Sequence, residues 1–439
     1  MRSSTSARVD VRARACRTVA AAALLLTIAS SCTSEPERRD LPDVDVGVPA
    51  DPTTAATSAG PSPTVASDVA GLTGRLAVLD ADGHLVTMNP DGSDEIMLDE
   101  VEPGTSQVRQ PTWSPDGRSV AWVHVEVSEA GALSASIATA GEDGTRPSTS
   151  RTTVVPFYLS WDPTSSRIAY LGAPSDTFIE LGVLEAAGRN SGTSLDAGQP
   201  VFFSWGPEGD QLLVHIGAER LDRLALDGST SVVGDRPGTF SVPVWTADGK
   251  TLVYSSVDEG GQRLVARNVN ADRGRPLVAY EGLIAFVVSP DGERVAFQVI
   301  QPGRILPLSV IDVDGGETVE IVDAPIASFF WSPDGERLLY LDPDPLPDDT
   351  GLWFRWGVWD GTSSFVTPRF APSQLISVEY LQFFEQYAQS MRLWSPDSRA
   401  FAYPGTSEDG QEGIWIQSAR PHRAPVLVAE GDFVAWSPA

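Results

Sequence analysis

The sequence predicts an all-β fold, a single eight-bladed β-propeller of four-stranded blades, and three observations lead to this prediction. A hairpin motif recurs along most of the chain, its copies follow one another at nearly constant intervals, and the two ends of the repeat region complement each other. The copy at Trp331-Ser332-Pro333-Asp334-Gly335 shows the motif most clearly. Its Ser, Pro and Gly suit a type I turn followed by a left-handed glycine, and apolar strands flank the turn.

Each copy of the motif begins with an anchor residue, which is Trp in all copies but one. The anchors are Trp113, Trp161, Trp205, Trp245, Val288, Trp331, Trp394 and Trp436. Six of the seven intervals between them are 40 to 48 residues, the length of a four-stranded blade, and one is 63 residues. Residues seven to nine positions after each of the first seven anchors are apolar, which indicates a strand covered on both faces. Eight anchors predict eight blades.

Three turns depart from the motif. Ser165 and Ser398 replace Gly, and Ala247 replaces Pro. A non-Gly residue in the left-handed conformation costs about 1 kcal/mol, which a large ring tolerates. We therefore expect these turns to keep the same shape.

The ends of the repeat region predict how the ring closes. The last anchor is followed only by residues 437–439, so its blade lacks the strand after the turn. Residues 74–78 fit that strand, and residues 84–88 and 95–98 supply two outer strands. The last strand and the first three strands would then share one blade, which leaves no exposed sheet edge.

The N-terminal region reads as an export signal followed by a tether. Residues 1–31 combine five Arg with a short apolar run, as in a signal peptide. Ala29-Ser30-Ser31-Cys32 resembles the lipobox of bacterial lipoproteins, with Ala29 where Leu is usual, which implies lipid attachment at Cys32. Plain secretion and an uncleaved anchor are the alternatives. Residues 32–73 are rich in Pro, Thr and Ser, typical of a disordered tether. The expected location is the outer face of the cytoplasmic membrane or the periplasmic side.

The Trp-Ser-Pro-Asp-Gly runs resemble the WD40-like repeats of the bacterial TolB-like propeller family, and also those of the propeller domains of some oligopeptidases. The resemblance covers residues 74–439, with an insertion at about 368–391. It implies the propeller fold and an extracytoplasmic binding scaffold. It carries no motif for a particular partner.

Composition narrows the possible partners and cofactors. The formal net charge is −28, so the surface repels nucleic acid and anionic membrane, and membrane contact is expected only through the lipid. The two cysteines, Cys16 and Cys32, both precede the propeller, which excludes a disulfide or thiolate metal site within it. No cofactor is expected. Asp342 and Asp344 are weak candidates for a metal site, because their spacing lacks the rest of a calcium-binding loop.

The sequence favours a protein that is not an enzyme, although it does not exclude catalysis. It has no Gly-x-Ser-x-Gly elbow, and its four histidines are scattered. His124 and His215 occupy matching places, near the end of the second strand of their blades. A propeller lyase or hydrolase acting on polysaccharide would require these histidines and several carboxylates to converge in the central channel.

The long interval before Trp394 predicts an inserted helix over 377–390, with Ser377 as its N-cap, because apolar residues recur there every three or four positions. The helix enters an innermost strand, so it lies on the face opposite the turns, which we expect to be the working face. Two interpretations remain open, a plug over the channel and a lid over a ligand. For the lid, the candidate contact residues are Arg109, Tyr380, Phe384, Gln386, Tyr387 and Arg392.

These observations predict an exported, lipid-anchored and monomeric propeller that acts as a non-catalytic binding or scaffold protein of the cell envelope. Its partner would be an envelope protein, a peptide or a glycan. The alternatives are the propeller enzyme described above and an ectodomain sensor that partners another envelope protein.

Overall fold

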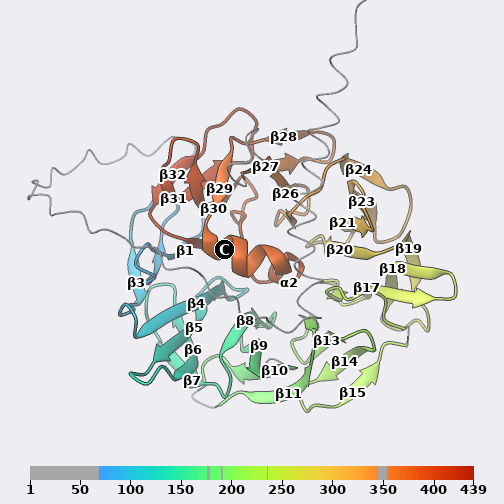
Figure 1. Cartoon of the computed structure of the whole chain (residues 1–439), viewed down its shortest axis with the longest axis horizontal. Helices are drawn as coiled ribbons and strands as arrows, with labels where there is room; N and C mark the ends of the chain where they lie inside the picture. Colours follow the sequence, from blue (N-terminus) through green and yellow to red (C-terminus); the bar gives the residue numbers. More distant parts are fainter. Residues whose placement is uncertain (1–68, 176–177, 189–190, 235, 345–352) are drawn as a thin grey trace, which may run out of the picture.

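The computed structural model describes residues 69–175, 178–188, 191–234, 236–344 and 353–439. Within these ranges the strands form seven antiparallel sheets, which are arranged as a ring around a common centre (Figure 1). The chain passes once round the ring, as the colours of Figure 1 show. The signal peptide, Cys32 and most of the tether lie outside the described residues.

Six of the seven sheets have four strands, or four strands with a short fifth. The first contains β1 (Leu76–Leu79), β2 (Leu85–Met88), β3 (Ile96–Asp99) and β33 (Phe433–Trp436). The second contains β4 (Ser106–Trp113), β5 (Ser119–Val127), β6 (Leu133–Gly141) and β7 (Ser148–Arg151). The third contains β8 (Pro156–Trp161), β9 (Arg167–Ser175), β10 (Phe178–Glu185) and β11 (Thr193–Gly198). The fourth contains β12 (Val201–Trp205), β13 (Gln211–Ile216), β14 (Arg220–Ala225) and β15 (Thr230–Val232). The fifth contains β16 (Val244–Trp245), β17 (Thr251–Asp258), β18 (Gly261–Asn268) and β19 (Arg275–Tyr280). The sixth contains β20 (Leu283–Val288), β21 (Arg294–Gln301), β22 (Arg304–Ile305), β23 (Leu308–Asp312) and β24 (Val319–Val322).

The seventh sheet has eight strands and joins two groups of four. Its strands are β25 (Ser328–Trp331), β26 (Leu338–Pro343), β27 (Phe354–Trp359), β28 (Ser364–Val366), β29 (Phe370–Pro372), β30 (Ala400–Ser407), β31 (Glu412–Ser418) and β32 (Val426–Ala429). The groups meet where Phe354 of β27 pairs with Phe370 of β29. In the second group the strand before the turn motif is reduced to one bridge, between Trp394 and Phe401.

The first and last strands of the described chain close the ring. β33 pairs with β1 over four residues, with Trp436 opposite Leu76, and the backbone N–H of Arg75 donates to Ser437 Oγ at 2.8 Å. The predicted sharing of one sheet by the two ends of the repeat region is therefore confirmed.

The turn motifs have the predicted left-handed geometry. In the first turn Gly117 has φ 72°, its N–H donates to the carbonyl of Ser114 at 2.9 Å, and Ser114 Oγ donates to Asp116 Oδ1 at 2.6 Å. The two serines that replace Gly also keep this conformation, since Ser165 has φ 59° and Ser398 has φ 57°.

The second strand of each four-stranded group forms the deepest part of the core, as predicted. The residues seven positions after the anchors are all buried; they are Val120, Ile168, Leu212, Leu252, Val295, Leu338 and Phe401. Their neighbours on both faces belong to adjacent sheets, so each sheet is packed between two others. The scaffold is therefore rigid around the centre of the ring.

Candidate functional site

A helical segment crosses the centre of the ring (Figure 1). It consists of η1 (Ile376–Tyr380), η2 (Leu381–Phe383) and α2 (Phe384–Tyr387), which are π-helical, 3-10 and α-helical turns. We call residues 373–390 the central cover. It contacts residues that lie one to four positions before the anchors, such as Phe157, Phe203 and Phe286, whereas the turn motifs follow the anchors. The central cover therefore closes the end of the ring opposite the turns.

The beginning of the central cover differs from the prediction. Ser373, not Ser377, caps the first turn, because Ser373 Oγ accepts from the backbone N–H of Ile376 at 3.3 Å. Ser377 instead lies within the segment, and its Oγ donates back to the carbonyl of Ser373 at 3.0 Å. The predicted helix thus begins about four residues earlier.

Side chains of the central cover bond to the backbone of the ring. Gln386 Oε1 accepts from the N–H of Phe203 at 2.9 Å, and its Nε2 donates to the carbonyl of the same residue at 2.8 Å. Glu385 Oε1 accepts from the N–H of Phe286 at 2.9 Å. Further bonds join Tyr387 Oη to Phe157 O, Tyr158 Oη to Gln386 O, Thr112 Oγ1 to Ser390 O and Ser373 Oγ to Asp432 O.

Aromatic packing completes the attachment. Phe384 contacts Phe329 of β25 edge-to-face, with ring centroids 4.8 Å apart, and Tyr380 packs on Phe433 of β33 at 5.1 Å. Together with its hydrogen bonds, the central cover contacts at least six of the seven described sheets. It acts as a hub that holds the ring together.

Four of the predicted ligand contacts are part of this packing. Tyr380, Phe384, Gln386 and Tyr387 are each no more than 6% exposed. The plug interpretation therefore describes them, and in this conformation their side chains are not available to a ligand on the cover face. The spacing that predicted a contact surface is that of a helix face packed on the core.

A small apolar cavity lies beneath the central cover. Trp356 and Tyr380 are among its lining residues, and neither Trp356 Nε1 nor Tyr380 Oη has a hydrogen-bond partner among the described residues. The space open to the centre of a water molecule is about 20 Å³, which is room for about one water. This cavity is too small for an organic ligand.

A larger pocket lies on the turn side of the central cover, whose Ala388 contributes to its lining. Its prolines are Pro290, Pro333, Pro396 and Pro438, which belong to four turn motifs. The anchors Trp331 and Trp394 and the side chain of Arg392 also line it, and the space open to water centres is about 120 Å³. We call it the turn-side pocket. The working face was predicted opposite the turns, where the central cover closes the ring centre, whereas this pocket is on the turn side.

Arg392 is the only ionisable residue among those that line the turn-side pocket. It is half-buried, and burial lowers the pKa of its guanidinium. No described side chain forms an ion pair or hydrogen bond with this guanidinium. An unpaired cation in such a place attracts an anion.

Arg109, the other predicted cation, is not part of this pocket. It is exposed on β4, and its charge acts on Tyr380 of the central cover, where it opposes the burial that raises the pKa of the phenol. The sequence predicted both arginines at one mouth. The structure separates them because Arg392 lies two residues before its anchor, further along the innermost strand.

Glu385 is a feature that the sequence did not indicate. Burial raises the pKa of its carboxyl to about 8, although the hydrogen bond from Phe286 works in the opposite direction. It lies between the buried residues Phe384 and Gln386 in the helical turn α2. A charged residue in such a helix normally faces solvent, so the sequence pattern does not show that Glu385 is buried.

The weak metal candidates Asp342 and Asp344 lie at the end of one strand. Asp342 lies within β26 and is buried, and Asp344 follows that strand. Burial raises the pKa of Asp344, but the hydrogen bond from Arg369 and the charge of Arg355 outweigh it, so the pKa lies below its usual value. Because Asp344 is bound by two guanidinium groups, it is already neutralised. Among the described residues no group of three or more His, Cys, Asp or Glu could hold a metal ion.

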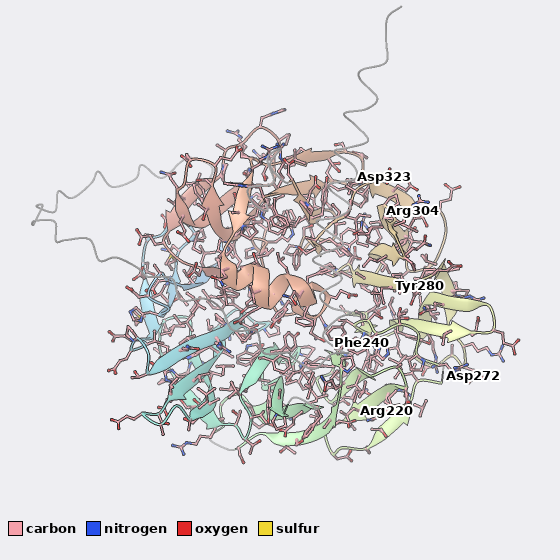
Figure 2. All side chains as sticks on the ribbon, in the orientation of Figure 1. Arg220, Phe240, Asp272, Tyr280, Arg304 and Asp323 are labelled. Atoms are coloured by element: carbon pink, nitrogen blue, oxygen red, sulfur yellow. The ribbon has the colours of Figure 1, made fainter. Side chains whose placement is uncertain are left out.

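The histidines do not converge at the ring centre. His124 Nδ1 lies 2.8 Å from Asp99 Oδ2, at the outermost strand β3 of the first sheet. His215 is buried, with Nδ1 3.0 Å from the carbonyl oxygen of Ser241, and it packs against Phe240. Figure 2 shows Phe240 on the same arc of the ring as Arg220. The convergence that a channel enzyme requires is absent from the described residues.

Part of the sequence is similar to that of known proteins. No family model matches the chain. Its sequence is 30% identical over 98 residues to the Tol-Pal system protein TolB of Anaeromyxobacter dehalogenans strain 2CP-1, and 31% identical over 88 residues to that of Anaeromyxobacter sp. strain K. The chain is a TolB-like propeller. The similarity spans about a fifth of these relatives, since it covers 22% and 20% of their lengths.

Solved structures also align with this TolB-like chain. A eukaryotic initiation factor aligns with a TM-score of 0.50 and 11% identity, over 83% of this chain and 98% of that one. TolB from Acinetobacter baumannii aligns with a TM-score of 0.39 and 14% identity, over 64% of this chain and 75% of that one. In the part of the TolB-like chain that the structure describes, no helix has the length and apolar character needed to cross a bilayer.

Proposed function

We propose that this TolB-like propeller is a non-catalytic binding scaffold of the cell envelope, and that it binds its partner at the turn-side end of the ring. The observation that carries the proposal is the asymmetry of the ring centre. One end is closed by the central cover, and the other holds an open pocket with an unpaired Arg392. A ring with a pocket open at one end of its centre suits recognition of a partner, which would be an envelope protein, a peptide or a glycan.

Eight blades are part of this proposal. The eight-stranded sheet contains two anchors, Trp331 and Trp394, each followed by its own turn motif, and its two groups are joined only through β29. Counting each group as a blade gives eight, in agreement with the eight anchors. An experimental structure with another number of blades would contradict this count.

Export and lipid attachment are also proposed. Their support is the signal-like segment 1–31, the lipobox-like sequence before Cys32 and the likeness to TolB. In cell fractionation we expect Cys32→Ser to move the protein from the membrane to the soluble fraction, whereas Cys16→Ser should leave it in place. Retention of the Cys32→Ser protein in the membrane pellet would argue against the lipid anchor.

The binding role is tested by crosslinking in intact cells. A photoreactive residue at position 333, beside the turn-side pocket, should capture an envelope component. A matched residue at position 378, which is exposed on the central cover, should capture little. Capture at position 378 alone would place binding on the other face, and no capture at either position would contradict the scaffold role.

A peripheral enzyme is the second candidate, and one observation favours it. The carboxylate of Asp99 accepts from the indole of Trp122 and orients His124, and His124 lines a groove that also contains Glu126 and Ser136. A carboxylate that orients a histidine is an arrangement used for general base catalysis. Turnover of a polysaccharide by the wild type that His124→Gln abolishes would replace the scaffold proposal.

A further inference from the structure

We infer that the turn-side pocket binds a carboxylate group attached to a compact apolar body, with Arg392 as its counter-charge. This inference rests on the proposed binding function and specifies the chemistry of the ligand at that site. The group could come from a small free acid or from the C-terminus of a peptide, and the experiment below separates these two sources.

The first argument is charge. The protein carries 59 acidic and 31 basic residues, and nine of its described arginines have an acidic partner; these are Arg75, Arg167, Arg220, Arg263, Arg275, Arg337, Arg355, Arg369 and Arg399. Arg392 lies away from any described carboxylate, although its surroundings are less exposed than most of the surface. A half-buried guanidinium is stabilised when an anion accepts its hydrogen bonds.

The second argument is position. The backbone on both sides of the Arg392 side chain is fixed, because its carbonyl accepts from the N–H of Trp436 at 2.7 Å and the carbonyl of Leu393 accepts from the N–H of Ala402 at 2.8 Å. These bonds tie Arg392 to β33 and β30. A guanidinium on a fixed backbone loses less conformational freedom on binding, and its planar fork matches the two oxygens of a carboxylate.

The third argument is the shape and nature of the walls. Trp331, Trp394 and Met391 line the pocket, and they offer apolar surface next to one positive charge. The space open to water centres, about 120 Å³, is about six times that of the cavity beneath the central cover. It accommodates a carboxylate with a few carbon atoms, and one arginine balances one negative charge. A phosphate dianion would retain an uncompensated charge, and a cation would be repelled.

The experiment titrates the full-length protein with isobutyrate, and with isobutyramide as the neutral control of the same shape. Binding is followed through the fluorescence of Trp331 and Trp394 and by calorimetry. We expect saturable binding of isobutyrate, no binding of the amide, and a loss of affinity of at least about tenfold in Arg392→Gln. Arg109→Gln, which removes an exposed arginine outside the pocket, should bind as the wild type does. Equal binding of acid and amide, unchanged binding by Arg392→Gln, or no binding of the acid would overturn the inference.

A second pair of probes separates the two sources. A tripeptide ending in valine with a free C-terminus is compared with the same peptide as its C-terminal amide. Tighter binding of the free peptide than of isobutyrate indicates a peptide terminus, and the reverse indicates a free acid. If circular dichroism shows that Arg392→Gln does not fold, Arg392→Lys is used as the variant. In that case the comparison of acid with amide on the wild type decides the outcome.

The result of the isobutyrate titration can be distinguished from the result of the crosslinking experiment that tests the scaffold proposal. If position 333 captures a partner from cells while isobutyrate does not bind, the carboxylate inference fails and the scaffold remains. If isobutyrate binds but no envelope component is captured, the scaffold proposal fails and the anion site remains.

Discussion

The indole Nε1 of Trp113 donates a hydrogen bond of 3.0 Å to the carbonyl oxygen of Ala435, which lies 322 residues away in the sequence. Ala435 directly precedes the anchor of the preceding sheet round the ring. The same relationship between an anchor indole and the carbonyl before the preceding anchor recurs at Trp161 to Thr112, Trp205 to Ser160, Trp331 to Val287 and Trp394 to Phe330. Five of the eight anchors therefore join neighbouring four-stranded groups through their indoles and are also core residues.

We expect Trp113→Phe to lower the free energy of unfolding by about 1 to 3 kcal/mol, because the buried carbonyl of Ala435 loses its donor. Trp245→Phe is the control, since the Nε1 of Trp245 donates to Gly249 within its own turn and not to a neighbouring sheet. The measurement is the midpoint of guanidinium unfolding. Equal losses in the two variants would show that indole volume, rather than the bond between sheets, determines the effect.

The attachment of the central cover can be weakened at one residue. Gln386→Leu keeps the approximate volume but removes the acceptor for the N–H of Phe203, so we expect a loss of about 1 to 3 kcal/mol in the free energy of unfolding. Gln382→Leu is the matched control, because the amide of Gln382 bonds only to Val378 within the cover. A fully stable Gln386→Leu variant would contradict the role of the central cover as a hub.

Glu385 predicts a stability that falls as the pH rises. Its pKa is raised by burial to about 8 in the folded protein, above the ordinary value of 4.5. Its contribution is therefore fully present below about pH 4.5 and is lost as the pH rises through 8, with a slope of at most about 1.4 kcal/mol per pH unit. Glu385→Gln should reduce this dependence between pH 5 and 8 and should be more stable than the wild type at pH 8. Unfolding curves measured across this range test it, and parallel profiles for the two proteins would refute it.

From the buried His215 we predict that the protein loses stability as the pH falls below 6.5. Burial lowers the pKa of its imidazole, so the folded protein favours the neutral ring. Its contribution is present above the ordinary pKa of 6.5 and is lost as the pH falls below that value towards the lower pKa of the folded state. His215→Asn should flatten the decline in melting temperature between pH 6.5 and 5, while His422→Asn, at an exposed site, should leave it unchanged. The same decline in all three proteins would exclude His215 as its source.

The fold could be predicted largely from the sequence because the turn motif is local. Ser, Pro, Asp and Gly specify the turn through contacts within six residues, and the strands on either side carry their own apolar pattern. Even the departures at Ser165 and Ser398 kept the turn, and the structure shows a compensation that spacing could not reveal. Ser165 Oγ accepts from the N–H of Asp116, and Ser398 Oγ accepts from the N–H of Asp334, each at 3.1 Å and each from the turn of a neighbouring copy.

The candidate site was harder to predict because it depends on contacts between residues far apart in sequence. The spacing around Tyr380 and Phe384 indicates an amphipathic helix in either interpretation, plug or lid, since both have an apolar face. Which end of the ring Arg392 reaches depends on its distance from the anchor Trp394 and on the path of the chain after the helix. The raised pKa of Glu385 likewise arises from burial in the assembled ring, where its carboxylate meets Phe286 of β20, a residue 99 positions earlier.

The central cover also limits how this protein could have evolved. Propellers change size when a repeat is duplicated or deleted, and a ring with an empty centre can accept such a change in circumference. Here one inserted segment contacts at least six of the described sheets and bonds to backbone groups of four ring residues, Phe157, Phe203, Phe286 and Asp432. A gained or lost repeat would move those groups out of reach of Gln386 and Glu385, so the insertion preserves the number of repeats in any lineage that retains it.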